Sequence, residues 1–340
     1  MVKKRTALIL LLIFASILIP PRAQAVTGCS KPLYKKKFII SGTYLEVISP
    51  YREAAGIVYG EFKRLDKIFN SYDSASELSR LNKTLKEPFK ASDELIEILQ
   101  RSWAIYNLSE GAFDVTQGSV YKFWKELIRR GEVKDFPALE AIRKIKASGG
   151  IDGVEVDFAG RTVTINKQGL TIDLGAIAKG YIIDKAIFQL KQAGIKSALI
   201  NAGGDIYCLG RRFGKPWKVG IKSSKQLQKI LETQLLIDQA VATSGGYEQF
   251  FSFQGKDYSH LIDPRKGYPV DTNIISVSVI AEDCTTADSL ATTFFILGAE
   301  GLKRILNRMP QTMRVFVVSS GDSPQQIHIF KGKKNKLKTQ

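Results

Sequence analysis

The sequence predicts an α+β fold in which mixed or antiparallel sheets pack against helices. Apolar residues at helical spacing mark several helices, whereas strand patterns dominate the second half of the chain. The two kinds of element do not alternate regularly, which argues against a doubly wound parallel sheet. The chain is long enough for a substantial core, and nothing in it demands two domains.

Three helices are predicted from apolar spacing and from signals at their ends. The first is expected after Ser49 and Pro50, an N-cap residue followed by a proline suited to a first turn. Ser92 is expected to cap the second helix. The third follows Gly175 and ends at Gly194, because glycine is favoured just beyond a helix C-terminus.

Strands are predicted where apolar runs are short or alternate with polar residues. In residues 275–281, isoleucine and valine alternate with serine, which is the pattern of a half-exposed strand. The charged stretch 125–148 has the look of an insertion or flap. The remaining strands are expected at 38–48, 170–174, 197–206, 217–222, 235–243, 314–319 and 326–330.

Residues 1–25 have the features of a signal peptide rather than of folded structure. A basic start precedes an apolar run over 7–19, which is too short to span a bilayer comfortably. An A-x-A cleavage signal ends at Ala25, and we favour cleavage there. The alternative is a lipobox at 26–29, in which Cys29 would be acylated and would anchor the chain to the inner membrane. Both interpretations predict an exported, periplasmic protein.

The charge and the cysteines narrow the classes of partner. The formal net charge is +17, and part of the excess lies in lysine clusters at 35–37 and 331–338. Such clusters suit an anionic membrane surface, but solvated segments are the simpler interpretation. No aromatic base-stacking platform accompanies them, so the sequence does not predict nucleic-acid binding. Cys208 and Cys284 are expected to be small buried residues, because an odd, sparse set of cysteines makes no disulfide framework.

Asp288 and Thr292 form a candidate metal-binding pair. They are four residues apart at the start of an apolar helix predicted over 287–297. This spacing places a carboxylate and a hydroxyl on one helix face, and both groups are hard-cation ligands that suit Mg²⁺. On spacing alone, a helix cap with a solvated face remains the alternative.

Two further features could carry chemistry. The segment 172–184, IDLGAIAKGYIID, predicts a strand–glycine–helix turn with Lys179 in the first turns of the helix. Free backbone groups, a helix N-terminus and a cation together suit a phosphate-bearing ligand. His260 precedes a turn at 263–267, where proline and glycine fit a β-turn. From the sequence alone, a packed or surface histidine is the simpler interpretation.

Further segments accompany the 172–184 turn in a fixed order. They are 71–82 (SYDSASELSRLN), 111–116 (GAFDVT), 201–205 (NAGGD) and a block that runs from 242–245 (ATSG) through 260–267 (HLIDPRKG) to 287–292 (ADSLAT). In this order the motifs resemble the FAD:protein FMN transferase family, also called ApbE. The resemblance implies an ApbE-like α+β fold, and the corresponding domain is placed at 38–332.

The resemblance also implies roles for single residues. Asp288 and Thr292 would bind a catalytic Mg²⁺ together with the backbone carbonyl of Ala176. His260 would act as a general base, because a neutral imidazole can take the proton of an attacking hydroxyl. Lys179 would add a fixed positive charge. The residues implied in contacts with FAD are Ser76, Asn82, Asp114, Lys179, Asp184, Gly203, Gly204, Asp205, Thr243, Ser244, Gly245 and His260.

The implied activity is a Mg²⁺-dependent flavin transferase. It would use FAD to attach FMN through a phosphoester to a threonine of a partner protein, such as a subunit of a membrane redox complex, and would release AMP. Two alternatives stay open: a periplasmic FAD pyrophosphatase that releases FMN and AMP, and a flavin-binding carrier without catalysis. Asn82 favours transfer over hydrolysis, and the presence of Asp288 and Thr292 disfavours the carrier.

Overall fold

The computed structural model describes residues 32–130, 135–222, 230–246, 249–320 and 326–333. The predicted signal peptide, Cys29 and most of the lysine-rich tail lie outside these residues. Within 33–340 the chain forms one compact unit. Among the described residues, no helix has the length and apolarity needed to cross a membrane.

Seven α-helices and one short 3₁₀-helix are present in the described part of the chain. They are α1 (Ala54–Phe69), α2 (Glu77–Leu81), α3 (Asp93–Leu108), α4 (Gly118–Arg130), α5 (Leu139–Ser148), η1 (Ile151–Gly153), α6 (Ala178–Gln192) and α7 (Cys284–Leu306). Ser92 caps α3 as predicted, because its hydroxyl accepts from Leu95 N–H. Gly194 follows α6 with a φ of 74° and completes the predicted glycine end signal.

The centre of the fold is an eight-stranded sheet in the order β1-β2-β6-β7-β10-β15-β16-β17, and every neighbouring pair is antiparallel. Its strands are β1 (Tyr34–Ile40), β2 (Thr43–Ser49), β6 (Ser197–Ala202), β7 (Asp205–Gly210), β10 (Gln239–Gly245), β15 (Ile274–Ala281), β16 (Arg314–Ser319) and β17 (Gln326–Lys331). This arrangement confirms the predicted α+β class.

Four smaller sheets complete the fold. Their strands are β3 (Phe89–Lys90), β5 (Thr162–Ile165) and β4 (Val154–Asp157); β8 (Trp217–Lys222) and β9 (Ile230–Leu236); β11 (Phe250–Phe253) and β12 (Lys256–Ser259); and β13 (Ile262–Asp263) and β14 (Tyr268–Pro269).

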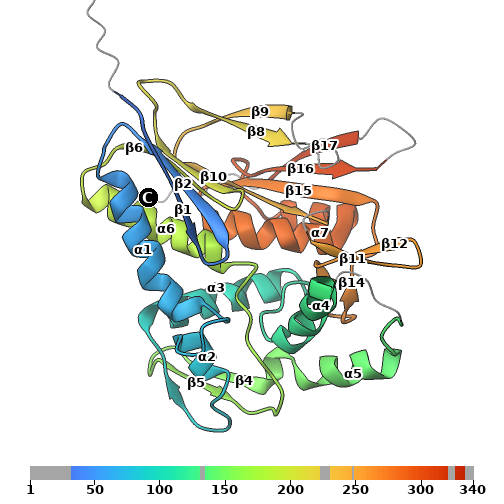
Figure 1. Cartoon of the computed structure of the whole chain (residues 1–340). Coiled ribbons are helices and arrows are strands. Elements are labelled where there is room, and N and C mark those ends of the chain that lie inside the picture. The colour runs from blue at the N-terminus through green and yellow to red at the C-terminus, as the bar shows by residue number, and fades with distance from the viewer. Residues whose placement is uncertain (1–31, 131–134, 223–229, 247–248, 321–325, 334–340) are drawn as a thin grey trace, which may run out of the picture. The chain divides into compact units, whose positions relative to one another are not determined.

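The central sheet is covered on both faces. Figure 1 shows α6 and α7 together on one face and the β8–β9 hairpin on the other. The helix side holds the larger core, in which Val277 and Val279 of β15 pack with Leu290 and Phe294 of α7. The hairpin side holds a second cluster around Trp217. Residues of β15 are therefore buried on both faces, as expected for a central strand of a covered sheet.

Three predicted strands are instead hairpins or parts of hairpins. The segment 38–48 turns at Ser41 and Gly42, which have φ of 52° and 72°. The segment 197–206 turns at Gly203 and Gly204, and β9 and β10 are separated near Asp238, whose φ is 50°. Left-handed backbone at these positions reverses the chain inside apolar stretches that otherwise have a continuous strand pattern.

Other local predictions were also wrong. The first helix begins at Ala54, because the hydroxyl of Ser49 donates to Ser197 O (2.7 Å) and accepts from Tyr51 N–H, and so does not cap a helix. Residues 170–174 form no regular strand and make only a single bridge, from Thr171 to Gln117.

The serines of β15 are not half-exposed, because both faces of the central sheet are covered. Ser276 and Ser278 are both buried. Ser278 lies within hydrogen-bonding distance of the Thr243 hydroxyl on β10, at 2.8 Å. The alternation of serine with isoleucine and valine is therefore not a sign of solvent on one face.

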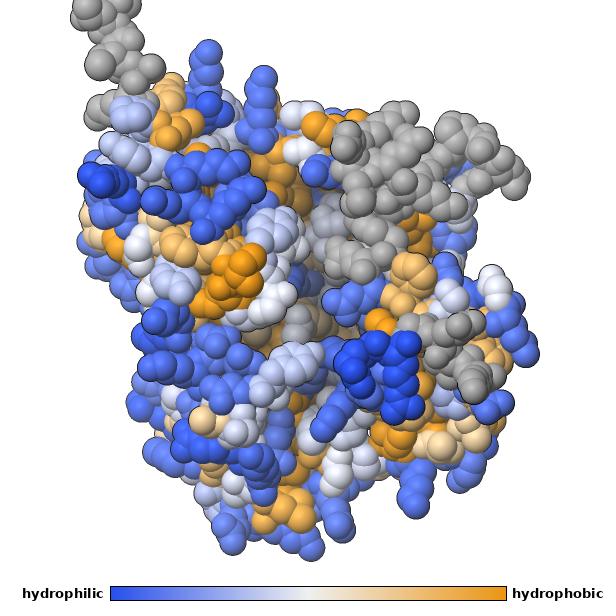
Figure 2. Space-filling model, viewed as in Figure 1, coloured by the Kyte–Doolittle hydropathy of each residue, from blue (hydrophilic) through white to orange (hydrophobic). Residues whose placement is uncertain are grey.

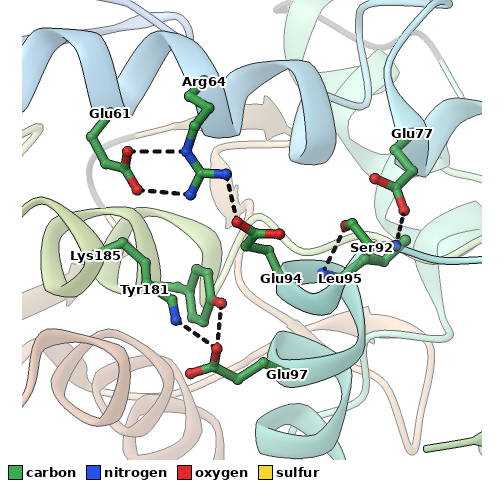
Figure 3. A network of polar contacts seen from close by, with 9 residues as sticks. All are labelled: Glu61, Arg64, Glu77, Ser92, Glu94, Leu95, Glu97, Tyr181 and Lys185. Carbon is green, nitrogen blue, oxygen red and sulfur yellow. Dashed lines mark hydrogen bonds and ion pairs between the residues drawn. The ribbon is translucent and has the colours of Figure 1, made fainter. Parts of the chain in front are cut away.

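Polar contacts join α3 to both α6 and α1. Figure 3 shows Glu97 of α3 accepting hydrogen bonds from the Tyr181 hydroxyl (2.8 Å) and from Lys185 Nζ (2.6 Å), both on α6. Arg64 of α1 contacts Glu94 of α3 in the same view. These polar contacts and the shared apolar core hold α6 beside α3.

The stretch 125–148 was expected to be an insertion or flap, but its described part is packed. Trp124 of α4 is fully buried and stacks on Phe251 at a ring separation of 5.8 Å. Its indole N–H donates to Gly267 O (2.8 Å). Ile142 of α5 belongs to the same apolar cluster. The segment forms a wall beside β11–β14 rather than a free flap.

Candidate functional site

A cavity of about 570 Å³ opens where the turns of the central sheet meet the first turns of α6 and the middle of α7. This volume lies within the range of small-molecule and cofactor sites, about 300–1,000 Å³. Figure 2 shows the molecular surface hollowed near the centre of the face drawn. Lining residues come from segments far apart in sequence: Ser41, Thr43, Asp114, Asp173, Ala176, Lys179, Gly203, Thr243, Ser244, His260, Asp288 and Thr292.

Lys179 lies at the base of this cavity between two buried carboxylates. Its Nζ pairs with Asp205 Oδ2 and lies 3.8 Å from Asp288 Oδ1. Burial alone would lower the pKa of Lys179, but the charges of Asp205 and Asp288 outweigh burial and raise its pKa well above the usual range. The ammonium therefore stays charged at neutral pH, which suits it to bind an anion and excludes it as a general base.

The close contact between α6 and α7 sets the position of Asp288. Gly180 N–H donates to Asp288 Oδ2 (3.1 Å). A Cβ at Gly180 would lie 2.3 Å from Cys284 O, so only glycine permits this approach of the two helices. From one turn further along α6, Asp184 accepts hydrogen bonds from Cys284 N–H (2.7 Å) and Thr285 N–H (2.8 Å). Asp184 thus caps the start of α7.

The predicted metal ligands share one wall of the cavity. Asp288 and Thr292 both lie on α7, which begins at Cys284 rather than at the predicted residue 287. The Thr292 hydroxyl lies 2.9 Å from the Ser244 hydroxyl of β10. Ala176, in the turn before α6, lines the same cavity. The three residues that would supply a carboxylate, a hydroxyl and a backbone carbonyl oxygen therefore all line one cavity.

This donor set fits Mg²⁺, which binds to protein through few oxygen ligands and keeps several waters. The local charge also favours a bound cation. The formal charges of Asp205, Asp288 and Lys179 sum to −1. Among the described residues there is no group of three or more His, Cys, Asp or Glu side chains that could hold a metal ion. A site that uses one carboxylate with hydroxyl and backbone oxygens does not require such a group.

His260 also lines the cavity and follows β12 in the chain. Its backbone N–H donates to Gln249 O (3.0 Å), and its ring Nδ1 is 3.2 Å from the same oxygen. Burial lowers the pKa of His260, the Gln249 carbonyl raises it, and Lys125 and Lys179 lower it further, so the net pKa is below its usual value. The imidazole is therefore neutral at neutral pH and can accept a proton.

Several lining residues were not predicted from the sequence. Lys125 of α4 forms an ion pair with Asp173 Oδ2 at 2.9 Å across the cavity. The Tyr121 hydroxyl donates to the backbone carbonyl of Asp114 (2.8 Å). Asp173 stood within the 172–184 motif but was given no role, and its place two residues before Gly175 was the available signal. Lys125 was missed because the charged stretch was taken for a flap.

Of the predicted FAD contacts, Asp114, Lys179, Gly203, Thr243, Ser244 and His260 line the cavity. Gly203 has a φ of 60°, and its N–H donates to Tyr44 O (3.0 Å), so this turn brings bare backbone to the cavity wall. The burial of Asp114 raises the pKa of its carboxyl, although Thr116 donates to it from both N–H and hydroxyl.

The other predicted contacts support the cavity from outside its lining. Ser76 caps α2 by accepting from Ser79 N–H. The Asn82 side chain accepts from Ile172 N–H (2.7 Å) and donates to Ile172 O (2.9 Å), which braces the segment leading to Gly175. Asp184 accepts from the backbone N–H groups of Cys284 and Thr285 at the start of α7. Gly204 and Gly245 each adjoin a lining residue in the chain, and Asp205 pairs with the lining residue Lys179.

Comparison with known proteins agrees with this architecture. The model of the ApbE family matches residues 41–317. A FAD:protein FMN transferase from Treponema pallidum is 32% identical over 308 residues, covering 84% of each chain. Another from Vibrio cholerae is 34% identical over 237 residues, covering 68% of this chain and 69% of the relative.

Solved structures give the same result. The flavin transferase ApbE from Vibrio cholerae superposes with a TM-score of 0.77 at 26% identity, covering 89% of this chain and 99% of the other. The ApbE protein from Thermotoga maritima superposes with a TM-score of 0.76 at 29% identity, covering 89% and 97%. On the extent of the family match, the identity to these relatives and the shared fold, the chain belongs to the ApbE family.

Proposed function

We propose that this chain is a Mg²⁺-dependent FAD:protein FMN transferase. The acceptor is a threonine hydroxyl of a partner protein, which attacks the phosphorus on the FMN side of the FAD pyrophosphate. A bond forms between the threonine oxygen and that phosphorus, and the bond from the phosphorus to the bridging oxygen breaks. AMP leaves with the bridging oxygen, and FMN stays on the partner as a phosphoester.

One observation carries this proposal. A single cavity brings together a half-buried cation, a neutral histidine and the Asp288–Thr292 pair, from segments about 30 to 80 residues apart in the chain. Phosphoryl transfer needs mainly positioning and charge neutralisation, and these groups supply both. The curated relatives named above, which are FAD:protein FMN transferases, support the same reaction.

The chain's own residues have distinct tasks in this reaction. Lys179 stays cationic and offsets charge on the pyrophosphate. His260 is the base that takes the proton of the attacking hydroxyl, and the Gln249 carbonyl fixes its ring. With Nδ1–H donating to that carbonyl, the lone pair of Nε2 would be available to accept the proton.

Asp288, Thr292 and the carbonyl of Ala176 would hold the Mg²⁺. When bound, this ion would polarise the phosphate oxygens and offset the charge that develops on the leaving AMP. The contact between Gly180 and Asp288 and the cap made by Asp184 keep α7 in place against α6. Both contacts preorganise the ligands before FAD arrives.

The transfer reaction differs from its two alternatives in its products. The purified chain is incubated with FAD, Mg²⁺ and membrane proteins from a host strain that lacks it, and nucleotides and protein-bound flavin are measured. Transfer gives AMP and flavin bound to protein in equal amounts, with little free FMN. A pyrophosphatase gives free FMN and AMP and leaves the proteins unlabelled, and a carrier gives no AMP at all. Either of the last two results would overturn the proposal.

The site of action belongs to the same proposal. Residues 1–25 would direct export, and the mature chain would work in the periplasm, either free or anchored to the inner membrane through Cys29. A membrane redox complex would then present its threonine from the same side of the membrane. The basic start, the apolar run and the A-x-A signal of the leader support this location.

A further inference from the structure

The central sheet has two functionally different ends. At one end, the β1–β2 and β6–β7 turns line the cavity through Ser41 and Gly203. At the other end, β1 starts and β7 finishes, since Tyr34 pairs with Ser49 and Ser197 pairs with Gly210. The β1–β2 and β6–β7 hairpins are joined at this end, because the Ser49 hydroxyl of β2 donates to Ser197 O of β6.

This second end carries the loop 211–215, RRFGK, which leads from β7 into β8. Figure 1 shows this connection beside the start of β1. The loop is closed by two hydrogen bonds, from Arg212 N–H to Lys215 O (2.8 Å) and from Lys215 N–H to Arg212 O (3.0 Å). Phe213 and Gly214 form its tip, with φ of 47° and 81°. These values describe a tight turn of type I′.

Phe213 is an unusual residue for such a tip. Turns of type I′ favour asparagine, aspartate or glycine, because a bulky side chain is strained at positive φ. Phe213 is also 46% exposed, so the chain covers only part of this apolar residue. Strain of this kind, at an exposed aromatic residue, indicates that the ring is used outside the folded chain.

Cationic residues flank Phe213 along the loop. Arg211, Arg212 and Lys215 are all exposed, and exposed Lys196 is adjacent, since a Cβ on Gly210 would lie 2.0 Å from Lys196 O. The loop and Lys196 together are called the basic end.

Carboxylates offset only part of this charge. Asp238 accepts from Gly210 N–H (2.9 Å), and the neighbours Arg52 and Glu53, which follow Ser49, cancel each other. The basic end of the sheet therefore keeps a positive excess.

We propose that the basic end, formed by Lys196 and the loop 211–215, docks the protein on an anionic membrane surface. The four cations would lie among lipid phosphates, and the Phe213 ring would enter the interface between headgroups and acyl chains. An anionic lipid surface fits both features of the loop, because its phosphates would pair with the cations and its acyl chains would accept the aromatic ring. A free anion offers no apolar region for the ring.

Docking through the basic end would set the distance of the cavity from the membrane. The strand β6 has six residues, so at about 3.3 Å per residue the cavity lies roughly 20 Å further from the membrane than the basic end. The described chain also begins beside the basic end, at the start of β1. A chain docked in this way would hold its cavity away from the lipid and open toward a protein partner. The inference does not depend on the transfer reaction.

Vesicle partition tests the proposal. A chain that starts at Val26, with Cys29→Ser to prevent acylation, keeps every described element and lacks the apolar leader. It is mixed with vesicles of phosphatidylglycerol and phosphatidylcholine at 0.1 M salt, and the bound fraction is measured by sedimentation. Each cation at an anionic surface strengthens partition about fivefold, so Arg212→Gln with Lys215→Gln should weaken it roughly 25-fold. At 1 M salt the binding of the parent chain should be lost.

Two comparisons separate docking from general effects. The matched control is Arg143→Gln with Lys144→Gln, which removes two exposed cations of α5 and should change partition less than about twofold. Phe213→Asn places a favoured residue in the turn, so its melting temperature should stay the same or rise. Its partition should nevertheless fall several-fold, which a purely structural role of Phe213 does not predict.

Three results would overturn the proposal. The parent chain could fail to bind anionic vesicles, or the basic-end and control pairs could weaken binding equally. The parent chain could also bind immobilised polyglutamate as tightly as vesicles, with no loss in the Phe213→Asn variant. That last result would assign the basic end to an acidic protein partner instead.

Discussion

Replacement of Gly180 by alanine tests how strongly the site depends on the contact between α6 and α7. The added Cβ would lie 2.3 Å from Cys284 O, 2.7 Å from Cys284 C and 2.8 Å from Thr285 Cα. All three are backbone atoms, which cannot rotate away as a flexible side chain could. To restore an ordinary contact of 3.4 Å or more, the two helices must separate by about 1 Å at this point.

The expected effects follow from that displacement. Overpacking costs about 1–3 kcal/mol of unfolding free energy, whereas alanine normally stabilises a helix interior by about 1 kcal/mol relative to glycine. The rate should fall more than the stability, because the displacement would break the hydrogen bond from Gly180 N–H to Asp288 and shift this carboxylate. A misplacement of 1 Å costs roughly 100-fold in rate. FAD affinity should change less than the rate, since most lining residues are elsewhere.

Gly60→Ala is the matched control. Gly60 lies in α1, is exposed and has no atom within 4 Å of an added Cβ. Urea unfolding should place the two variants about 1–3 kcal/mol apart, with Gly60→Ala the more stable. Single-turnover flavin transfer should be normal in Gly60→Ala and roughly 100-fold slower in Gly180→Ala. Equal stability and equal rates in the two variants would refute the role given to this helix contact.

Three further predictions concern the metal, the base and export. Asp288→Asn should raise the Mg²⁺ concentration needed for activity by at least roughly 10–100-fold, as measured by Mg²⁺ titration, and an unchanged requirement would exclude Asp288 as a ligand. His260→Asn should slow single-turnover transfer about 10²–10⁴-fold with little change in FAD affinity. Because the pKa of His260 is lowered from 6.5, the wild-type rate should not change with pH above 6.5 and should fall as the pH drops through the histidine pKa. The same pH profile in the His260→Asn variant would contradict the base role. The mature chain should begin at Val26, or at an acylated Cys29 if the lipobox is used. The intact mass of the protein purified from its native host distinguishes these two forms. A chain that still begins at Met1 would contradict both.

The features that the sequence predicted well are local ones. The spacing of Asp288 and Thr292 placed them on one helix face, and the end signals of α3 and α6 were read correctly from Ser92 and Gly194. Such features depend on residues only a few positions apart. The burial of Cys208 and Cys284 was also predicted, because their sparse distribution gave them no disulfide partner.

The features that the sequence did not predict depend on contacts between distant residues. Asp184 caps a helix 100 residues away, and Asn82 braces a segment 90 residues away. Neither partner can be read from the local pattern, so these structural contacts of the two residues were not predicted. The hairpin at Ser41 was missed for a different reason, since serine at positive φ is a weaker turn signal than asparagine or glycine.

The lysines show the same distinction. Lys179 was recognised because it follows a glycine turn at a helix start, which is a local arrangement. Lys125 reaches Asp173 only because the aromatic cluster around Trp124 packs α4 against β11–β14. A charged stretch alone cannot reveal that packing, and its charges were therefore taken for a solvated surface.

The central claim is that the cavity transfers FMN from FAD to a threonine of another protein. Its most direct test is peptide mapping of membrane proteins from a host strain that lacks the chain, after reaction with the purified chain, FAD and Mg²⁺. The account predicts a peptide that has gained one FMN on a threonine, with one AMP released for each, and no such peptide when Asp288→Asn replaces the parent chain at low Mg²⁺. Release of AMP and free FMN in equal amounts, with every threonine peptide unmodified, would contradict it.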